Sequence, residues 1–580
     1  KAKAIIVAQL GSPPTKDMAV GEQAQIYVRV PADAIPGETK IKVENVNGRQ
    51  DLIVTVPTEA VPDDLLMLTE VVKQDSRSWQ ILVVPAAIAK DMVAQKEPEK
   101  LQAPLPPDQM DYGAGEPITL FQAKIDPVKS YEALVEAAVL NGGYVNPKIE
   151  RAAIPEIPGM VGMIAKEPIE AGEEIARMPC SIHISLRTMP ALLPELLAEV
   201  QKLPGFVDQF KKDIWIAACV TKLLAEAVER VRQNLAIKPE AGNLASLWGC
   251  YVDQLLGEDF SNHPYWHWIE EAPQCLADLA PSPEGPHAEM MASDVLRSYH
   301  IIEKNIPADL LGDGYSAGLF LHARLSSLTR VFHTCPEYAS LVPVIDLFNH
   351  SPDHTCDWKF SEEADAQILT ANRAHKAGEQ LWITYGMRPN TVLLRTYGFT
   401  LPPSMEPSWS YIFQQTKPVC LFEHFLTEDF LYKPLYLDTR LVQDSLIDAL
   451  NVCTQRGHNA REFLFRICKR MLEDYDTDPM LQPALAALRR VRAKDPSTAA
   501  WWDEMAPADS QPTQWKESCV SAKMSEYLCL TSHIEICQMH DGSLTQDKLF
   551  QSARTVGTLL CEAFDQLQQC GMFRLVTSPA

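Results

Sequence analysis

The chain has 580 residues, more than one hydrophobic core usually accommodates, which indicates roughly two to four domains. Hydrophobic residues make up 46% and charged residues 22%, as in ordinary globular proteins, and no apolar run of about 18 residues predicts a membrane span. The net charge of −24 disfavours nucleic acid and membrane partners and favours a basic segment of another protein, although acidity can also serve solubility alone.

Residues 1–90 are expected to form a β-rich repeat module. The segment VRVPADAIP at 28–36 returns as VTVPTEAVP at 54–62, and LVVPAAIA at 82–89 is a looser third copy. Each copy is a short strand of β-branched residues that a proline ends, so we expect a small antiparallel sheet. The following residues, 91–125, are rich in Pro, Gly and charge and predict an exposed linker.

An interrupted β domain is expected after this linker. YEALVEAAVLNGG at 131–143 predicts a helix with a glycine stop, and strand-rich sequence follows. IEAGEEIARMP at 169–179 resembles HKAGEQLWITYG at 375–386, and a long helical region, about 187–325, separates the two. Two hairpin-like units therefore flank a helical insert.

The tail, residues 403–580, is expected to be helical. Apolar residues repeat there at helical spacing, namely Leu464, Ile467, Cys468, Met471 and Leu472. The fourteen cysteines of the chain form no CxxC pair, which argues against a zinc knuckle and is typical of buried free thiols. We therefore expect a reducing compartment, either the cytoplasm or a plastid.

The polar stretch DLFNHSPDHTC at 346–356 admits several interpretations. His350 and His354 have the spacing of zinc ligands on a helix, but Pro352 between them disfavours a helix, and no glutamate completes an HExxH motif. Cys356 with His350 would make a nucleophile pair, for which no supporting loop is visible. The simplest alternative is that Asn349 and His350 only cap the apolar run VPVIDLF, which reads as a buried strand.

The surrounding motifs resemble a known family. LVPVIDLFNHS at 341–351, AGEQLWITYG at 377–386 and NTVLLRTYGF at 390–399 follow in the order typical of SET-domain methyltransferases. PGMVGMIAKEPIEAGEEIARMP at 158–179 is similar to the N-terminal half of that domain. The long insert is similar to the branch of the plastid Rubisco large-subunit lysine methyltransferase.

This resemblance implies an α+β multidomain fold. It would comprise the small N-terminal β-sheet module, a SET core at 126–402 that the helical insert interrupts, and an all-α substrate-binding domain at 403–580. It also implies S-adenosyl-L-methionine as cofactor and no metal, because the sulfonium leaves as a neutral thioether and the protein must only align, desolvate and hold the reactants.

Cofactor-binding roles carry over residue by residue from the family. Asn349 and His350 resemble the pair that anchors the cofactor, and Arg330 matches the arginine near its carboxylate. The glycine-containing motif falls on Met160, Val161 and Gly162, with Met160 replacing the usual first glycine. We expect Asp353, His354 and Cys356 to be bystanders in the next loop.

The resemblance also assigns the catalytic and substrate-facing residues. Tyr385 matches the active-site tyrosine, whose phenol orients the incoming nitrogen and whose ring faces the sulfonium. Tyr397 in the YGF segment is expected to line the same channel. Asp346 and Trp358 are expected on the substrate side, the first as a carboxylate facing the ammonium and the second as a wall.

The expected function is protein-lysine N-methylation of a non-histone protein by a monomer. The target is expected in a basic segment. A histidine-methylating relative within the same branch lacks the YGF tyrosine, so the presence of Tyr397 favours lysine. Histidine methylation and a non-catalytic SET-fold adaptor remain the alternatives.

Overall fold

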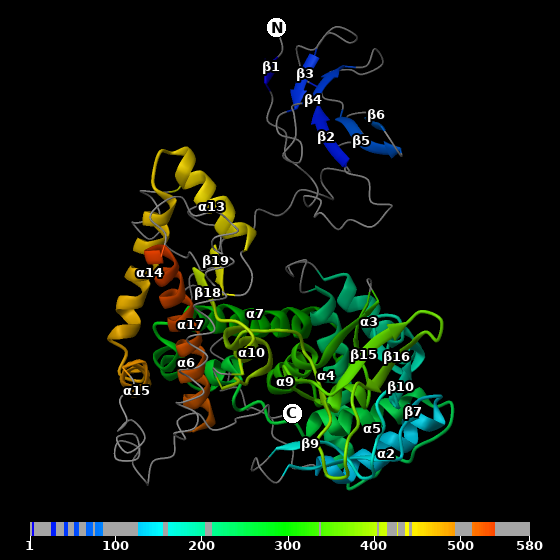
Figure 1. The fold of residues 1–580 in the computed structure, drawn as a ribbon. Coiled ribbons are helices and arrows are strands. Elements are labelled where there is room, and N and C mark those ends of the chain that lie inside the picture. Colours follow the sequence, from blue (N-terminus) through cyan, green and yellow to red (C-terminus); the bar gives the residue numbers. More distant parts are fainter. Residues whose placement is uncertain are drawn as a thin grey trace. The chain divides into compact units, whose positions relative to one another are not determined.

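The computed structural model describes residues 126–154, 160–203, 211–335, 338–402, 405–413, 426, 435–439, 443–493 and 513–539, and of the preceding part the strand segments 3–4, 25–30, 40–43, 52–56, 65–73 and 76–84. The chain divides into two compact units, residues 1–113 and 114–580, and each is described by itself (Figure 1). No helix in the described part of the chain is long and apolar enough to cross a membrane.

The first unit contains two three-stranded sheets, with the orders β1-β3-β4 and β2-β5-β6. Their strands are β1 (Lys3–Ala4), β2 (Gln25–Arg29), β3 (Lys40–Val43), β4 (Leu52–Thr55), β5 (Leu65–Lys73) and β6 (Ser76–Val84). The three sequence copies coincide with β2, β4 and β6. The expectation of one antiparallel sheet was wrong, because β4 pairs with β3 in one sheet whereas β2 and β6 both pair with β5 in the other.

The second unit has a β core whose two halves lie on either side of the helical insert in the sequence. The N-terminal half contains α2 (Pro127–Leu140), β7 (Tyr144–Val145), β8 (Ile149–Ala153), β9 (Val161–Ala165), β10 (Glu174–Pro179) and β11 (Ile184–Ser185). The C-terminal half contains β12 (Val331–Cys335), β13 (Tyr338–Leu341), β14 (Asn349–His350), β15 (Cys356–Ser361), β16 (Ala366–Ala371), β17 (Trp382–Ile383) and α10 (Asn390–Tyr397).

The two halves are joined by strand pairing. The principal sheet has the order β15-β16-β10-β7, so the central strand β10 pairs with β16 from beyond the insert. The two AGE turns also meet: the N–H of Ile169 donates to the carbonyl of His375 at 3.0 Å, and the N–H of His375 donates back at 2.8 Å. The resemblance between these turns therefore marks segments that lie side by side.

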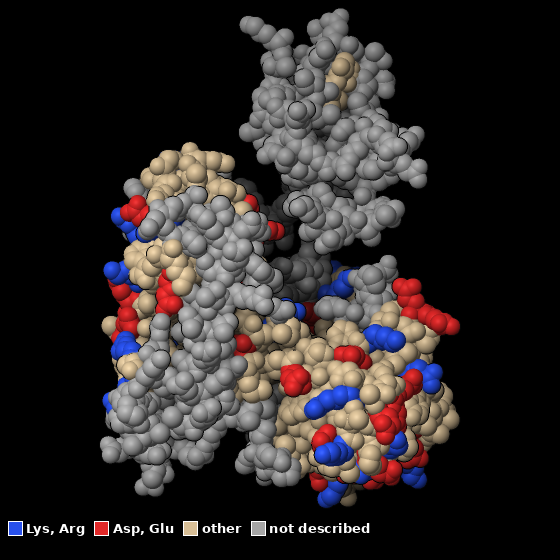
Figure 2. Space-filling model, in the orientation of Figure 1, with Lys and Arg blue, Asp and Glu red and all other residues tan. Residues whose placement is uncertain are grey.

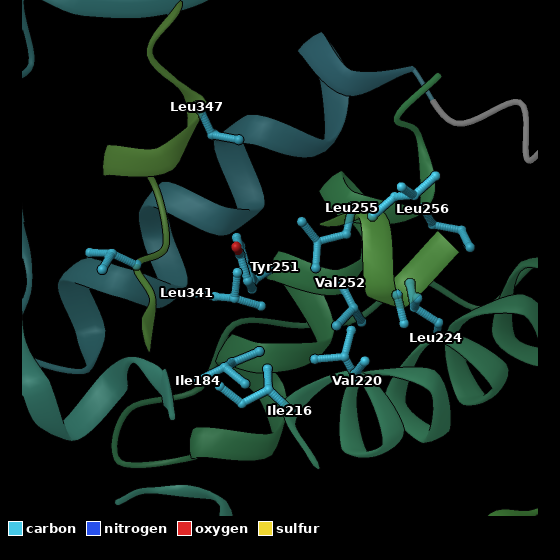
Figure 3. Packing of buried hydrophobic residues seen from close by; sticks show 14 of the residues in the cluster. Ile184, Ile216, Val220, Leu224, Tyr251, Val252, Leu255, Leu256, Leu341 and Leu347 are labelled. Atoms are coloured by element: carbon cyan, nitrogen blue, oxygen red, sulfur yellow. The ribbon is translucent and has the colours of Figure 1, made fainter. Parts of the chain in front are cut away.

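The insert consists of helices α3 (Pro194–Gln201), α4 (Lys211–Arg232), α5 (Leu244–Leu256), α6 (Pro264–Leu279), α7 (Glu284–Asn305), α8 (Ala308–Leu311) and α9 (Ala317–Arg330). It shares one core with the strands (Figure 3). Ile184 of β11 and Leu341 of β13 belong to the same buried cluster as Ile216 on α4 and Tyr251 on α5. Burial of this apolar surface fixes the helices against the β core.

The C-terminal region has a second core of its own. Helices α13 (Asp444–Gln455), α14 (Ala460–Asp476), α15 (Gln482–Arg492) and α17 (Gln514–Met539) surround it, together with the hairpin strands β18 (Ser410–Phe413) and β19 (Leu435–Asp438). The predicted apolar face of α14 is confirmed, because all five of its residues belong to or contact this core. The predicted α+β class with a helical C-terminal region is likewise confirmed.

The expected strand at VPVIDLF was wrong. Strand β13 ends at Leu341, and a 3₁₀ turn follows at Ile345–Leu347. Pro343 has no N–H to donate to a β ladder, and Val344 adopts a φ of +70°, which reverses the chain. The run is buried throughout because the insert covers it, and apolar content alone does not separate a buried strand from a buried turn.

Candidate functional site

Asn349 and His350 form β14, which lies parallel to β17 and is buried. The Asn349 amide Nδ2 donates to the carbonyl of Val161 on β9 at 3.1 Å. This approach requires Gly162, because a Cβ at that position would lie 3.0 Å from Nδ2 of Asn349 and 2.5 Å from Nε2 of Gln380. The glycine of the first motif thus lets the N-terminal half of the β core meet the Asn349 side chain.

The His350 ring is held against Tyr385. The backbone N–H of Tyr385 donates to His350 Nδ1 at 3.0 Å, so the neutral imidazole carries its proton on Nε2. Burial lowers the pKa of His350 to about 4, which keeps the ring neutral at physiological pH. In the described part of the structure, neither Nε2 of His350 nor Oδ1 of Asn349 has a hydrogen-bond partner.

Tyr385 belongs to an aromatic group that includes Tyr397 and Phe399. Its ring centroid lies 4.8 Å from that of Tyr397 and 6.4 Å from that of Phe399. Its hydroxyl donates to the carbonyl of Phe348 at 2.9 Å, and burial raises the pKa of this phenol. The two predicted catalytic tyrosines are therefore brought together next to the Asn349–His350 pair.

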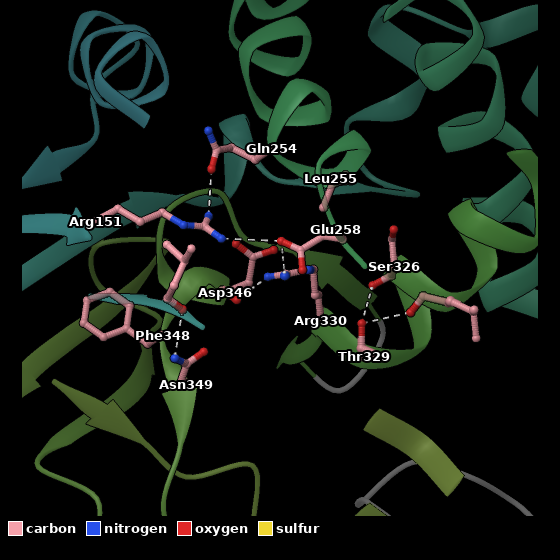
Figure 4. A network of polar contacts seen from close by, with 12 residues as sticks. Arg151, Gln254, Leu255, Glu258, Ser326, Thr329, Arg330, Asp346, Phe348 and Asn349 are labelled. Carbon is pink, nitrogen blue, oxygen red and sulfur yellow. Dashed lines mark hydrogen bonds and ion pairs between the residues drawn. The ribbon is translucent and has the colours of Figure 1, made fainter. Parts of the chain in front are cut away.

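A buried ion network adjoins this group (Figure 4). The Glu258 carboxylate lies 2.6 Å from Arg330 Nη2 and 3.5 Å from Arg151 Nη2, and all three side chains are at most 5% exposed. Arg330 Nη1 also donates to the carbonyl of Asp346 at 2.7 Å. Burial acts to lower the pKa of Arg330, but the Glu258 and Asp346 carboxylates outweigh it and raise the pKa.

Asp346 lies within this network. Its carboxylate accepts a hydrogen bond from the Tyr251 hydroxyl, and burial raises its pKa to about 6 although Arg330 opposes the shift. Arg151 also donates to the side-chain oxygen of Gln254 at 2.7 Å. Two arginines and two carboxylates are thus buried together with little water, so removal of one charge would leave its partners uncompensated.

A small pocket opens beside Tyr385. Its lining residues are Glu258, Asp259, Phe260, Asn262, His263, Thr329, Arg330, Tyr385, Tyr397 and Gly398. Seven of these lie in the insert or at its C-terminal boundary, and Tyr385, Tyr397 and Gly398 come from the C-terminal half of the β core. The pocket is therefore built where the insert meets the tyrosines.

Of the predicted residues, Arg330, Tyr385 and Tyr397 line the pocket, whereas the Asn349–His350 pair and the glycine motif do not. Asp346 joins the ion network instead, and Trp358 donates its indole N–H to the carbonyl of Thr384 at 3.1 Å. The Met160 side chain is buried, and its carbonyl accepts from Ile154 N at 2.9 Å.

The remaining polar residues of 346–356 lie outside this arrangement. His354 pairs with Asp357 at 2.9 Å, and burial raises the pKa of the Cys356 thiol to about 12, which opposes thiolate formation. Within the ranges that the structure describes, no group of three or more His, Cys, Asp or Glu side chains is placed to hold a metal ion. Ten cysteines in the described ranges are buried and form no disulfide, as the sequence indicated.

Sequence reasoning missed the contribution of the insert. Gln254, Glu258 and Asn262 follow one another around the end of α5, and each makes a buried polar contact with the β core. The available signal was a set of polar residues at the end of the apolar helix segment LWGCYVDQLL. Their partners are far away in the sequence, so local spacing could not identify them.

Comparisons with known proteins identify the domain. Residues 159–386 match the family described as SET domain, and the chain contains a SET domain there. Mouse SET domain-containing protein 4 is 29% identical over 175 residues, which cover 27% of this chain and 37% of that protein. Ribosomal lysine N-methyltransferase 4 of Schizosaccharomyces pombe is 39% identical over 61 residues, or 10% of this chain and 13% of that protein.

The chain therefore spans little more than a third of the first of these curated relatives and much less of the second. A solved structure described as "Structure of Rubisco LSMT bound to AdoMet" matches with a TM-score of 0.48 and 18% identity, covering 77% of this chain and 99% of that chain. A structure described as Rubisco LSMT bound to sinefungin and monomethyllysine matches with a TM-score of 0.47 and 16% identity, covering 73% and 96%.

Proposed function

We propose that this chain is an S-adenosyl-L-methionine-dependent protein-lysine N-methyltransferase that acts on a non-histone protein. The observation that carries the proposal is that Asn349, His350 and Tyr385, within the residues that match the SET domain, lie together with Tyr397 beside a pocket. The sequence relatives named lysine methyltransferases support the same reaction. None of these residues alone would support the proposed reaction.

The residues present fit the cofactor. The unpartnered Oδ1 of Asn349 is a free acceptor and the N–H of His350 Nε2 is a free donor, the kinds of group that an adenine or an amino-acid group uses. The buried guanidinium of Arg330 suits a carboxylate, although Glu258 and the Asp346 carbonyl already engage both its Nη atoms. When bound, S-adenosyl-L-methionine supplies an electrophilic methyl group on a sulfonium.

The chain's own groups would then prepare the nucleophile. The aromatic walls of Tyr385 and Tyr397 exclude water and disfavour the charged form of an entering amine, which must lose its proton before it can react. The Tyr385 phenol is fixed by its bond to Phe348, so its ring is pre-oriented. Tyr397 narrows the channel and favours an unbranched alkyl amine over an imidazole.

The target is proposed to lie in a basic segment of another protein. The net charge of −24 favours such a partner. On the face shown in Figure 2, Lys and Arg side chains are intermixed with Asp and Glu, so the acidic excess is not gathered into one patch there. The preference therefore rests on overall charge, and the identity of the target needs experiment.

Calorimetry with S-adenosyl-L-methionine tests the proposal first. Saturable binding at micromolar to millimolar cofactor is expected, and its absence would leave the adaptor interpretation standing. Mass spectrometry of a lysate treated with the protein and isotopically labelled cofactor should then find methyllysine. Methylhistidine as the main product would favour the histidine alternative instead.

A further inference from the structure

Asn262 lies where three parts of the chain meet. It follows α5 in the insert, and it is one of the residues that line the pocket, as is Tyr397. Its amide Nδ2 donates to the carbonyl of Gly398, in the YGF segment, and to Oγ of Ser518 on α17 at 3.2 Å. Asn262 is 6% exposed and Ser518 is fully buried, so water does not compete with these bonds.

These contacts fix which way the amide faces. The Gly398 carbonyl can only accept a hydrogen bond, so the NH₂ group of Asn262 must face it and Oδ1 must lie on the other side. That oxygen has no hydrogen-bond partner among the residues described. A buried acceptor without a partner costs about 1–3 kcal/mol, so its presence at a pocket wall indicates a donor that arrives with a ligand.

The rest of the pocket indicates what that donor is. Tyr385 and Tyr397 present aromatic rings, and Asp259 adds an exposed carboxylate. Arg330 also lines the pocket, but Glu258 at 2.6 Å offsets its charge. Aromatic rings with an acceptor and an uncompensated carboxylate suit a ligand that carries N–H donors and a positive charge, such as an alkylammonium group.

The position of Gly398 makes the contact sensitive to geometry. Its φ of +76° favours glycine, and a Cβ there would lie 3.2 Å from Cα of His263, the neighbour of Asn262. The YGF segment and the Asn262 loop are thus in close contact with little room to shift. A change in the hydrogen bond between Asn262 and Gly398 would therefore alter the position of Tyr397, the residue before Gly398.

We propose that Oδ1 of Asn262 accepts a hydrogen bond from the target amine, and that Ser518 on α17 helps to hold it in that position. This inference rests on the proposed function and adds a substrate-contacting residue from the insert. It also connects the C-terminal helical region to the pocket, because Ser518 on α17 is one of the two hydrogen-bond partners of the Asn262 amide.

The test measures binding of the full chain to L-lysine and to L-norleucine, which has a similar aliphatic side chain but no side-chain amine, with S-adenosylhomocysteine present. Saturation-transfer NMR should show that the unaltered protein prefers lysine. Asn262→Ala should lose roughly tenfold in lysine affinity and keep its norleucine signal, because only the donor-bearing ligand loses a partner. Asn262→Asp keeps an acceptor oxygen but loses the N–H donor to the Gly398 carbonyl, so it should retain more of the lysine preference than Asn262→Ala does.

Ser518→Ala should weaken lysine binding by a smaller factor, because the Gly398 anchor remains. Asn243→Ala is the matched control; Asn243 caps α5 in the same insert through its bond to Ser246 N and does not line the pocket. Binding of S-adenosylhomocysteine checks that each variant is folded. If Asn262→Ala fails this check, Asn262→Ser, whose hydroxyl is too short to span both contacts, takes its place.

The inference would be overturned if Asn262→Ala and Asn262→Asp lost lysine binding equally, since Asn262 would then act only as a tether. It would also be overturned if the unaltered protein did not distinguish lysine from norleucine. The proposed function fails separately, if labelled cofactor transfers no methyl group to any protein. If the unaltered protein methylates lysine and Asn262→Ala binds lysine normally, the proposed function stands and the inference about Asn262 fails.

Discussion

The backbone N–H of Tyr385 donates to Nδ1 of His350 at 3.0 Å, and the two rings stack with centroids 5.1 Å apart at 26°. The proposed cofactor-binding residue thereby positions the proposed catalytic one. The hydrogen bond sets the tautomer of the imidazole, and the stacked imidazole supports the phenol ring.

Tyr385→Phe is expected to lower kcat by about 10²-fold, because the phenol acts on the nitrogen and methyl group only as they react. Cofactor affinity should change by less than about threefold, since the ring and its stacking remain. Steady-state kinetics together with calorimetry separates the two effects. Tyr436→Phe, at an exposed position on β19, is the control. A variant that lost cofactor affinity and kept kcat would contradict the role assigned to the hydroxyl.

Asn349→Ala should show the opposite pattern. It removes the bond to the Val161 carbonyl and the free acceptor Oδ1, so cofactor affinity is expected to fall about tenfold or more. At saturating cofactor, kcat should change much less. Calorimetric titration of the variant provides the measurement, and unchanged cofactor affinity would exclude Asn349 from the binding site.

The sequence predicted the site residues that lie close together along the chain, but not those whose partners are far away in the sequence. Asn349, His350, Tyr385 and Tyr397 lie within one stretch of ordered motifs, so their meeting could be anticipated. Glu258 reaches Arg151 on β8 only because the insert folds back over the β core, and no short-range pattern encodes that approach. Asp346 was expected to face the substrate because its sequence neighbours are site residues. Its carboxylate instead accepts a hydrogen bond from Tyr251 of the insert, a contact that local spacing could not indicate either.

Glu258→Gln is expected to destabilise the fold by about 3–5 kcal/mol, because Arg151 and Arg330 would share a buried volume with one carboxylate fewer. Chemical denaturation followed by circular dichroism measures the loss. The control is Asp365→Asn, which breaks the half-exposed pair with Arg187 and should cost less than about 1 kcal/mol. Equal losses in the two variants would show that the buried network contributes no more than a surface pair.

Glu526 on α17 predicts a pH dependence of stability. Burial, reinforced by Glu284, raises its pKa to about 8, and it accepts hydrogen bonds from Ser282 and Tyr475, both at 2.8 Å. The folded pKa exceeds the unfolded one, so the protonated carboxyl stabilises the fold and this contribution is lost as the pH rises through about 8.

The free energy of unfolding should therefore fall between about pH 4.5 and pH 8, the unfolded and folded pKa values of Glu526, and it should fall less steeply in Glu526→Gln. Denaturant titrations across this range supply the test. Glu284, whose pKa burial raises to about 7, titrates with the same sign, so a residual slope is expected in the variant. Identical slopes in the two proteins would show that Glu526 does not control the effect.

The pairing of β10 with β16 has a consequence for how the chain is made. Strand β10 leaves the ribosome long before its central neighbour, because the whole insert must be synthesised in between. Until then β10 has an unpaired edge, and such edges promote association between chains. The nascent protein should therefore be most prone to aggregation while the insert is emerging, and chains that stop before β16 should be insoluble even if every insert helix has formed.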